Sequence, residues 1–438
     1  MSAVPIVVLG AGPAGAAVAI GLRRLGYDVC VVSEWRRFSA VEGVSARVLE
    51  GLRRAGLSRA FACAGSASSR QVRWNEITSV RNQEFLLDRS RLDAALREDM
   101  CTAGVRIVEA RALKVDSSEA GHRILLEWDG AQRWLEGDFL VEARGRQAPL
   151  GRMRLRGPET VTLLNQWHED PGRCASAVES LVDGWSWMAR LPDGRCFWQL
   201  SLDAKSASLP MRDNMEEYCI QRRLQSELSC ELFGSVSSEG VYVHARSSTA
   251  TLALETGGGN WLRVGDAAMA VDPLSGNGIF QALSSAMQAP AVINTILTCP
   301  ERSRLALDFH QQRVEHLFLR FARTGRDFYS LEQHWATEGF WAARSSWPDA
   351  EPLHAAPRFS SLEVRHAPVL KDNLVEEAEV VVSEDQSLGM WHLNGIELAP
   401  RVLQLQSGQD FPAVSADLTE AQAAMLLAWL RSQGFLAA

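Results

Sequence analysis

The stretch Val264–Gln281 reads VGDAAMAVDPLSGNGIFQ, and the rest of the chain is best interpreted outward from it. An apolar strand leads into Gly265 and Asp266, and a glycine-bracketed turn over 276–278 leads into an amphipathic helix. Glycines let the backbone approach a ligand closely, and the start of a helix presents unpaired N–H groups. Such groups favour an anion or a developing negative charge. The stretch therefore predicts half of a binding site, and the other half must come from elsewhere in the chain.

Composition limits the possible classes of protein. The chain has 438 residues, of which 46% are apolar and 22% charged, so we expect a globular protein of two or three domains. A net charge of −8 disfavours nucleic-acid binding as the main function. The 8 cysteines are scattered without Cys-x-x-Cys pairs, which predicts no metal site and a reducing compartment. With neither a leader nor a membrane-spanning apolar run in view, we expect a cytoplasmic protein.

The N-terminal segment supplies a nucleotide-binding pattern. A buried strand over 4–9 is followed by GAGPAG, a helix over 13–25 and a strand over 28–33. In such a βαβ unit the glycines allow a tight turn, a close approach of a pyrophosphate and helix–strand packing, and a following acid accepts hydrogen bonds from a ribose. The predicted contacts with a dinucleotide cofactor are Gly10, Gly12, Ala14, Gly15 and Glu34.

Two further segments carry arginines in informative places. A loop over 41–57 enters a helix and holds Arg47, and a helix over 88–103 begins at Arg89. A cation at a helix start is not favoured by the helix dipole, which indicates an anionic partner for Arg89. The strand over 138–143 then runs into Arg144-Gly145-Arg146 at a carboxyl edge, where α/β sheets bind ligands.

The middle of the chain has a different pattern, typical of antiparallel strands. Alternating segments over 159–168, 181–189 and 196–202 are joined by turns rich in Pro, Gly and Asp. This region, 156–255, predicts a β-sheet inserted between two parts of the nucleotide-binding domain. The candidate acid–base groups on it are His168, Asp183 and Gln199, and the candidate walls of a substrate pocket are Trp185 and Trp187.

The C-terminal part predicts a helical region followed by a small domain. The helical pattern covers 303–344, and a Pro/Ser/Ala-rich linker follows it. The segment 352–438 predicts a small α+β domain with a strand over 402–406 and a closing helix that ends at Gly434.

Four motifs in this order resemble one superfamily of flavoproteins: GAGPAG with Glu34, DRSRLD at 88–93, FLVEARGR at 139–146 and GDAAMAVDPLSGNGI at 265–279. They are similar to the FAD-dependent monooxygenases with the p-hydroxybenzoate hydroxylase fold, in the branch of tryptophan halogenases and geranylgeranyl reductases. The resemblance covers about residues 4–345 and implies an α/β fold: a Rossmann-like FAD-binding domain (1–155 and 256–345) with an inserted antiparallel β-sheet substrate domain. It implies that FAD is bound by Arg47, Arg89, Asp266, Pro273, Gly276, Asn277 and Gly278, in addition to the N-terminal residues. Arg144 departs from the Ala-Thr-Gly usual in the family.

A halogenase is disfavoured by one missing residue. The segment GWSWM at 184–188 is close to the Trp-x-Trp signature of flavin halogenases, but Ala189-Arg190 replaces the Ile-Pro that follows it there. Halogenases also need a lysine near the flavin in the first third of the chain. The lysines here are Lys114, Lys205 and Lys371, and Lys114 falls within a strand pattern.

The remaining reaction is hydroxylation of an aromatic ring through a flavin hydroperoxide, with NAD(P)H as a transient reductant. The small C-terminal domain indicates a macromolecular substrate. Together these features resemble the flavoprotein monooxygenases of tryptophylquinone biogenesis for quinohemoprotein amine dehydrogenase, which implies hydroxylation of a peptide tryptophan in a partner protein. Two alternatives stay open: a halogenase or geranylgeranyl-reductase-like enzyme acting on a small molecule, and a non-catalytic, FAD-stabilised partner-binding protein.

Overall fold

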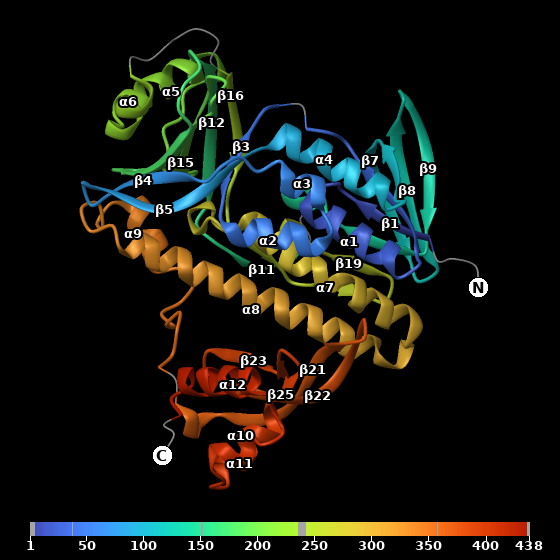
Figure 1. Ribbon diagram of the computed structural model, residues 1–438. Coiled ribbons are helices and arrows are strands. Elements are labelled where there is room, and N and C mark those ends of the chain that lie inside the picture. Colours follow the sequence, from blue (N-terminus) through green and yellow to red (C-terminus); the bar gives the residue numbers. More distant parts are fainter. Residues whose placement is uncertain (1–4, 37, 150–151, 235–241, 357, 436–438) are drawn as a thin grey trace. The chain divides into compact units, whose positions relative to one another are not determined.

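The computed structural model divides into two compact units. The first unit comprises residues 1–290 and 317–350, and the second comprises 291–316 and 351–438 (Figure 1). The structure describes all residues except 1–4, 37, 150–151, 235–241, 357 and 436–438. In the described part of the chain, no helix combines the length and the apolar character needed to cross a membrane.

A mainly parallel sheet forms the centre of the first unit, in the order β18-β19-β10-β1-β2-β6. Its strands are β1 (Pro5–Leu9), β2 (Asp28–Ser33), β6 (Arg106–Glu109), β10 (Phe139–Glu142), β18 (Gly257–Gly258) and β19 (Trp261–Arg263). Val8 of β1 pairs with Val31 and Val141 on its two sides, and the middle of each of these strands is apolar because both faces of the sheet are covered. The helices of this part are α1 (Pro13–Arg24), α2 (Ala46–Ala55), α3 (Ser58–Ala62), α4 (Arg89–Thr102) and the first part of α7 (Gly278–Thr298). The predicted Rossmann-like unit is confirmed.

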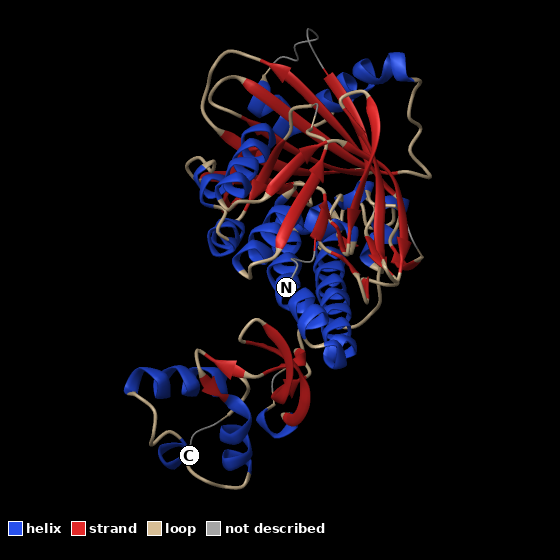
Figure 2. Cartoon of the chain, turned by 90° about the vertical axis from the view of Figure 1, so that its right-hand side faces the viewer, coloured by secondary structure: helices blue, strands red, loops and turns tan. Residues whose placement is uncertain are grey.

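A second, larger sheet has the order β16-β12-β15-β14-β13-β4-β5-β3. Figure 2 shows the long strands of the first unit in red. Its strands are β3 (Val41–Val44), β4 (Ser68–Trp74), β5 (Ile77–Asp88), β12 (Thr160–His168), β13 (Ala175–Leu181), β14 (Gly184–Arg190), β15 (Arg195–Asp203) and β16 (Tyr242–Ser247). The segment 181–189, predicted as one strand, is the turn and second arm of the β13–β14 hairpin. The sheet also takes three strands from 41–88, so it extends beyond the inserted segment 156–255.

The two faces of this larger sheet have different coverings. On one face, Leu163, Met188 and Trp198 form a core with two helices, α5 (Met215–Leu224) and α6 (Glu227–Phe233), which lie beside the sheet in Figure 1. Because side chains alternate along a strand, Trp187 and Gln199 point to the opposite face. That second face packs partly against residues of the stretch around 274, and it is the face that concerns function.

The remaining elements of the first unit are smaller. An outer sheet consists of β7 (Arg111–Ser118), β8 (Gly121–Trp128) and β9 (Ala131–Gly137), and another of β11 (Met153–Arg156), β17 (Thr251–Ala253) and β20 (Met269–Ala270). The helical pattern predicted over 303–344 is divided into α8 (Ser303–Ser330) and α9 (Gly339–Ser345). The first part of α8 belongs to the second unit, and its last part, from Leu317, belongs to the first.

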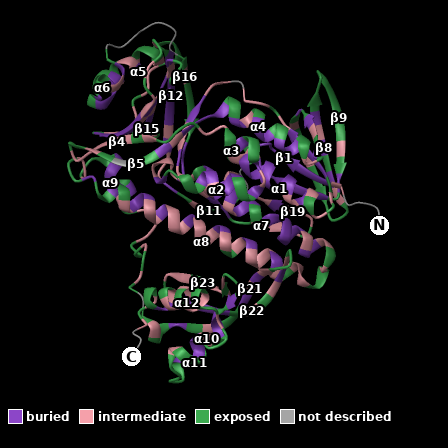
Figure 3. Ribbon diagram, viewed as in Figure 1, coloured by how far each residue is buried: buried purple, intermediate pink, exposed green. Residues whose placement is uncertain are grey.

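The second unit has its own core and is an α+β structure, as predicted. Its elements are β21 (Glu363–Lys371), β22 (Leu374–Ser383), β23 (Gln386–Met390), β24 (His392–Leu393), β25 (Ile396–Glu397), α10 (Leu398–Gln406), α11 (Phe411–Val414) and α12 (Glu420–Ser432). The strand predicted over 402–406 is wrong, because this segment is the end of α10. Leu398, Val402 and Leu405 lie at helical spacing and all are buried in this core, as Figure 3 shows for α10. With the two units together, the predicted α/β fold class is confirmed.

Candidate functional site

The first glycine-containing loop joins β1 to α1 and contains glycines of two kinds. Gly10 has φ +106°, and an added Cβ atom would lie 2.4 Å from the carbonyl oxygen of Ala143; a Cβ on Gly15 would lie 2.0 Å from that of Gly10. These two glycines are required by the packing of the protein itself. Gly12, by contrast, has ordinary extended angles (φ −69°, ψ −178°), and an added Cβ would meet no protein atom within 4 Å. The open space at Gly12 lies at the start of α1, which fits a cofactor phosphate.

The stretch around Asp266 lies against this loop. A Cβ added to Gly265 would lie 2.8 Å from that of Ala14, so the short helix η3 (Gly265–Ala267) contacts the first turn of α1. Arg146 lies 3.5 Å from the Asp266 carboxylate and also donates hydrogen bonds to two backbone carbonyls, which fixes its position. Burial raises the pKa of Asp266, and the charge of Arg146 opposes the rise. Three of the four motifs therefore meet at this edge of the central sheet.

The second glycine-containing loop precedes α7. The Asp272 carboxylate accepts a hydrogen bond of 2.9 Å from the N–H of Leu274 and so caps the short helix η4 (Pro273–Ser275). Gly276 has φ +62°, which suits glycine, and the Asn277 amide donates to the carbonyl of the residue two before it. Gly278 begins α7. A Cβ at either glycine would meet no protein atom within 4 Å, so this loop also leaves space for a ligand.

A group of arginines borders the same site. Arg89 is buried at the start of α4, 2.5 Å from the Glu42 carboxylate and 3.0 Å from that of Asp93. Burial disfavours the charge of Arg89, but these two acids outweigh it and raise its pKa. Burial would also raise the pKa of Glu42, yet Arg89 and Arg246 hold it below its ordinary range, with a smaller effect of Arg36. The anionic partner inferred for Arg89 is thus Glu42 together with Asp93, within the protein.

Arg246 and Arg146 are functional candidates that the sequence did not identify individually. Arg246 lies on β16 and donates a hydrogen bond of 3.3 Å to Gln199 on β15. Its charge interacts with Glu42 and with Arg146, which bonds to Asp266. No local pattern singles out Arg246, because its neighbours on β12 and β15 come from other parts of the sequence.

The other predicted cofactor residues lie at the surface. Glu34 directly follows β2, and its side chain is 45% exposed and 3.8 Å from Arg111. Arg47 is exposed in the first turn of α2. Glu34 stands at the carboxyl edge of a parallel strand, where a ribose binds in such folds. This position supports its predicted role as the acceptor of ribose hydrogen bonds, which stays a prediction. The role of Arg47 stays a prediction on the sequence motif alone.

The structure separates the three candidate acid–base residues. His168 is exposed at the end of β12, and Asp183 lies in the β13–β14 turn, where its carboxylate is 2.5 Å from Arg222. Of the three, only Gln199 contacts one of the arginines at the site, Arg246. On the neighbouring strand it pairs with Trp187. Catalytic roles for these residues remain predictions, and position favours Gln199.

The two predicted pocket tryptophans differ in their surroundings. Trp187 is half-buried, whereas Trp185 is 5% exposed and its indole N–H donates to the hydroxyl of Tyr329 over 3.1 Å. Tyr329 in turn donates to Asp272 over 2.9 Å. Asp272 lies within the motif at 265–279, whereas Tyr329 lies 57 residues away on α8 and has no local signal in the sequence.

Comparisons with known proteins agree with this site. The family model of the FAD binding domain matches residues 3–316. A solved structure of the peptidyl tryptophan dihydroxylase QhpG, essential for tryptophylquinone cofactor biogenesis, is 60% identical, with a TM-score of 0.90 over 99% of this chain and 100% of that one. The flavin-dependent halogenase CmlS shares the fold at 14% identity, with a TM-score of 0.79 over 99% of this chain and 95% of that one. The tryptophan 2-halogenase of Chondromyces crocatus is 24% identical over 376 residues, which are 78% of this chain and 71% of that protein.

The geometry and the comparisons lead to the same cofactor. The open positions at Gly12, Gly276 and Gly278 and the helix starts beside them fit FAD, and the family model covers all four motifs. The resemblance predicted from these motifs is confirmed, as is FAD as the cofactor, with NAD(P)H as the reductant typical of such proteins. This chain belongs to the FAD-binding-domain family and is a flavin-dependent monooxygenase.

Proposed function

We propose that this chain hydroxylates a tryptophan side chain in a partner polypeptide during the formation of a tryptophylquinone cofactor. The observation that carries the proposal is the 60% identity with the peptidyl tryptophan dihydroxylase, which extends over 99% of the chain and so includes the second unit. At this identity the pocket and the surfaces that select a substrate are expected to be retained along with the fold.

The second face of the larger sheet supports an aromatic substrate. Trp187 and Gln199 stand side by side on β14 and β15, and Gln199 is bonded to Arg246. A tryptophan ring is well accommodated by an aromatic surface, and an amide with a guanidinium group can bind the peptide carbonyls that accompany it. We assign Trp187 to the pocket wall and Gln199 with Arg246 to the orientation of the peptide.

FAD, held by the glycine-containing loops and reduced by NAD(P)H, would supply the oxygen chemistry, in which one atom of O₂ goes to an aromatic carbon and the other leaves as water. The protein must hold the ring in place, exclude water and neutralise the negative charge on the cofactor. The N–H groups at the start of α7 can stabilise the negative charge on the cofactor. The buried cluster around Trp185, Tyr329 and Trp341 can exclude water.

The surroundings of the lysines argue against halogenation. Lys114 lies on β7 of the outer sheet, where it is exposed and forms an ion pair of 2.8 Å with Asp116. The halogenase similarities are at 14% and 24% identity, far below that of the dihydroxylase.

All 8 cysteines are free thiols, which is compatible with a reaction carried out in the cytoplasm before any export of the partner.

The test is the conversion of a cognate peptide. Purified FAD-loaded protein, NAD(P)H, O₂ and a partner polypeptide that contains the target tryptophan are expected to give a product heavier by one or two oxygen atoms at that residue. A matched polypeptide with the tryptophan replaced by phenylalanine serves as the control. Oxidation of NAD(P)H without any modified tryptophan, or a product that contains halogen when bromide is supplied, would contradict the proposal.

A further inference from the structure

A chain of hydrogen bonds joins the larger sheet to the loop 273–278 before α7, which we call the flavin loop. The proposed hydroxylation assigns no role to these bonds. It runs from the indole N–H of Trp185 to the hydroxyl of Tyr329 (3.1 Å) and from that hydroxyl to the carboxylate of Asp272 (2.9 Å). Trp185 is 5% exposed and Tyr329 is 2% exposed, so both groups that donate in this chain are shielded from water, and Asp272 is partly buried. Shielded hydrogen bonds to a carboxylate are stronger than those at a surface.

The chemistry of the three groups fixes the direction of this chain. An indole N–H can only donate, and an ionised carboxylate can only accept. The single proton of the Tyr329 hydroxyl must therefore point to Asp272, because the oxygen is already the acceptor for Trp185. Trp185 thus determines the orientation of the bond that reaches the flavin loop.

Asp272 determines the shape of that loop. Its carboxylate accepts from the N–H of Leu274, and its backbone carbonyl accepts from both the N–H and the hydroxyl of Ser275. These bonds fix the turn that ends in Gly276 and starts α7. Leu274 in addition packs against the buried cluster that contains Trp185 and Tyr329, so the loop is attached to the cluster by both polar and apolar contacts.

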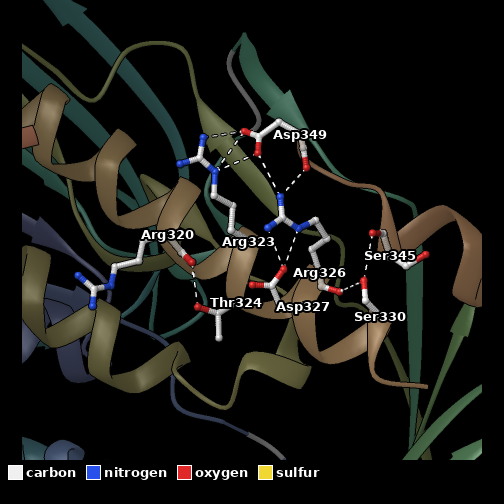
Figure 4. Close-up of polar contacts among 8 residues, drawn as sticks. All are labelled: Arg320, Arg323, Thr324, Arg326, Asp327, Ser330, Ser345 and Asp349. Carbon is white, nitrogen blue, oxygen red and sulfur yellow. Dashed lines mark hydrogen bonds and ion pairs between the residues drawn. The ribbon is translucent and has the colours of Figure 1, made fainter. Parts of the chain in front are cut away.

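Tyr329 is held by the end of α8, which is itself fixed. Arg323 lies 2.9 Å from the Asp349 carboxylate, and Arg326 donates to the Asp349 carbonyl over 2.6 Å, while Ser330 bonds to Ser345 (Figure 4). The Tyr329 ring also packs edge-on against neighbouring aromatic rings at 5.8 Å. The hydroxyl of Tyr329 therefore occupies a defined position relative to the flavin loop.

We propose that Tyr329 is a positioning residue: oriented by Trp185, its hydroxyl holds the Asp272 carboxylate and thereby keeps loop 273–278 in the conformation that presents its N–H groups to the flavin ring. The inference rests on the assignment of this loop to the flavin and does not depend on the identity of the substrate. It links a residue of the substrate-facing sheet to the cofactor through a single phenol.

The charges around Asp272 give the inference a pH signature. Burial raises the pKa of Asp272, and the bonds from Leu274 and Tyr329 and the charges of Arg344 and Arg146 oppose this rise. Removing the hydroxyl takes away one of the opposing effects, so Asp272 will take up a proton at higher pH in the variant. A protonated Asp272 is a weaker acceptor, and the loop loses its cap as the pH falls.

The test is Tyr329→Phe, which removes the hydroxyl and keeps the ring. In the apoprotein, hydrogen exchange of the peptide that contains 273–278 is expected to become about ten- to a hundredfold faster, the range for a lost hydrogen bond to a charged group. In the FAD-loaded protein without any substrate, the flavin absorption spectrum is expected to change below neutral pH. Tyr218→Phe removes a hydroxyl that interacts with Arg222, and it is expected to leave both readouts unchanged.

A second variant separates positioning from a general loss of stability. Trp185→Phe is expected to change the exchange of 273–278 in the same direction but by less, and the double variant with Tyr329→Phe is expected to match Tyr329→Phe alone. Additive effects, or a Tyr329→Phe protein that melts earlier but keeps the wild-type exchange and spectrum, would overturn the inference. Neither readout involves a peptide substrate, so failure of the proposed tryptophan hydroxylation would leave this result standing.

Discussion

The two glycine-containing loops of the first unit, 10–15 and 272–278, both precede a helix. The physical reason for glycine differs between them. In the first loop, Gly10 and Gly15 lie against backbone atoms at distances that leave no room for a Cβ. In the second, Gly276 and Gly278 face space that the protein does not fill. The first loop is thus constrained by the protein itself, whereas the second leaves room for a ligand.

Gly12 lies in the first loop, but like the glycines of the second loop it faces open space. Its backbone angles are open to any residue, and no protein atom lies near an added Cβ. The presence of glycine in a motif therefore does not show whether folding or binding requires it. The local space at each position shows it, and the predictions at Gly10, Gly12 and Gly278 test this distinction.

The largest effect is expected at Gly10. Gly10→Ala places a Cβ 2.4 Å from the Ala143 carbonyl oxygen at φ +106° and should destabilise the apoprotein by at least about 4 kcal/mol. Urea unfolding of the apoprotein measures this. The matched variant Gly12→Ala should stay within about 0.5 kcal/mol of wild type. Equal destabilisation of the two variants would remove the distinction between the two kinds of glycine.

A large effect confined to the cofactor is expected at Gly12. Gly12→Val should leave the apoprotein folded and weaken FAD binding roughly a hundredfold, which is about 2.8 kcal/mol, because the side chain fills the space beside the helix start. Titration of the apoprotein with FAD, followed by flavin fluorescence, gives the affinity. Wild-type affinity in this variant would show that the open space is not the cofactor site.

A moderate, pH-dependent effect is expected at Asp272. Burial raises its pKa in the folded state, so ionising Asp272 costs global stability: this cost is absent at low pH and appears as the pH rises through the folded-state pKa, even though the ionised form is the better cap of the loop. Asp272→Asn keeps an oxygen that accepts from Leu274 and Tyr329 without the buried charge. The variant should therefore melt at a higher temperature than wild type at about pH 8 and at the same temperature at about pH 3, below the ordinary pKa of Asp. Thermal unfolding of the apoprotein at both pH values tests this, and lower stability at pH 8 would refute it.

The smallest effect is expected at Gly278, with opposite signs for the protein and the cofactor. Alanine is a better helix former than glycine, so Gly278→Ala should stabilise the apoprotein by about 0.3 kcal/mol while weakening FAD binding about tenfold. Unfolding and titration of the same preparation give both numbers. Parallel changes of stability and affinity would assign this glycine to the fold.

Much of the fold was predictable because its signals are local. The apolar run before GAGPAG, the helix starting at Arg89 and the alternating strand over 159–168 all match the elements found, within one or two residues. The strand predicted over 402–406 failed because a short alternation of apolar and polar residues is compatible with either element. There the core around Val402 and Leu426 selects the helix.

The candidate site was predictable in part for the same reason. The glycines and Asp266 belong to motifs with fixed spacing, so the sequence located them and, through the family that the motifs indicate, the cofactor FAD. Arg246 and Tyr329 were not found, since each reaches the site from a distant element and neither has a characteristic neighbour in sequence. His168 and Asp183 were equally plausible from sequence, yet the structure places one at a sheet end and the other in an ion pair with Arg222.

The sequence by itself determined the cofactor, the fold class and the positions at which the backbone approaches a ligand, because each depends on residue types at short fixed spacings. The tertiary structure alone decided which glycines are enclosed by protein atoms and which face open space. It alone brought Trp185, Tyr329 and Asp272 into one chain of hydrogen bonds. The reason is that contacts between residues far apart in sequence depend on how the strands and helices pack, and no local pattern encodes that packing.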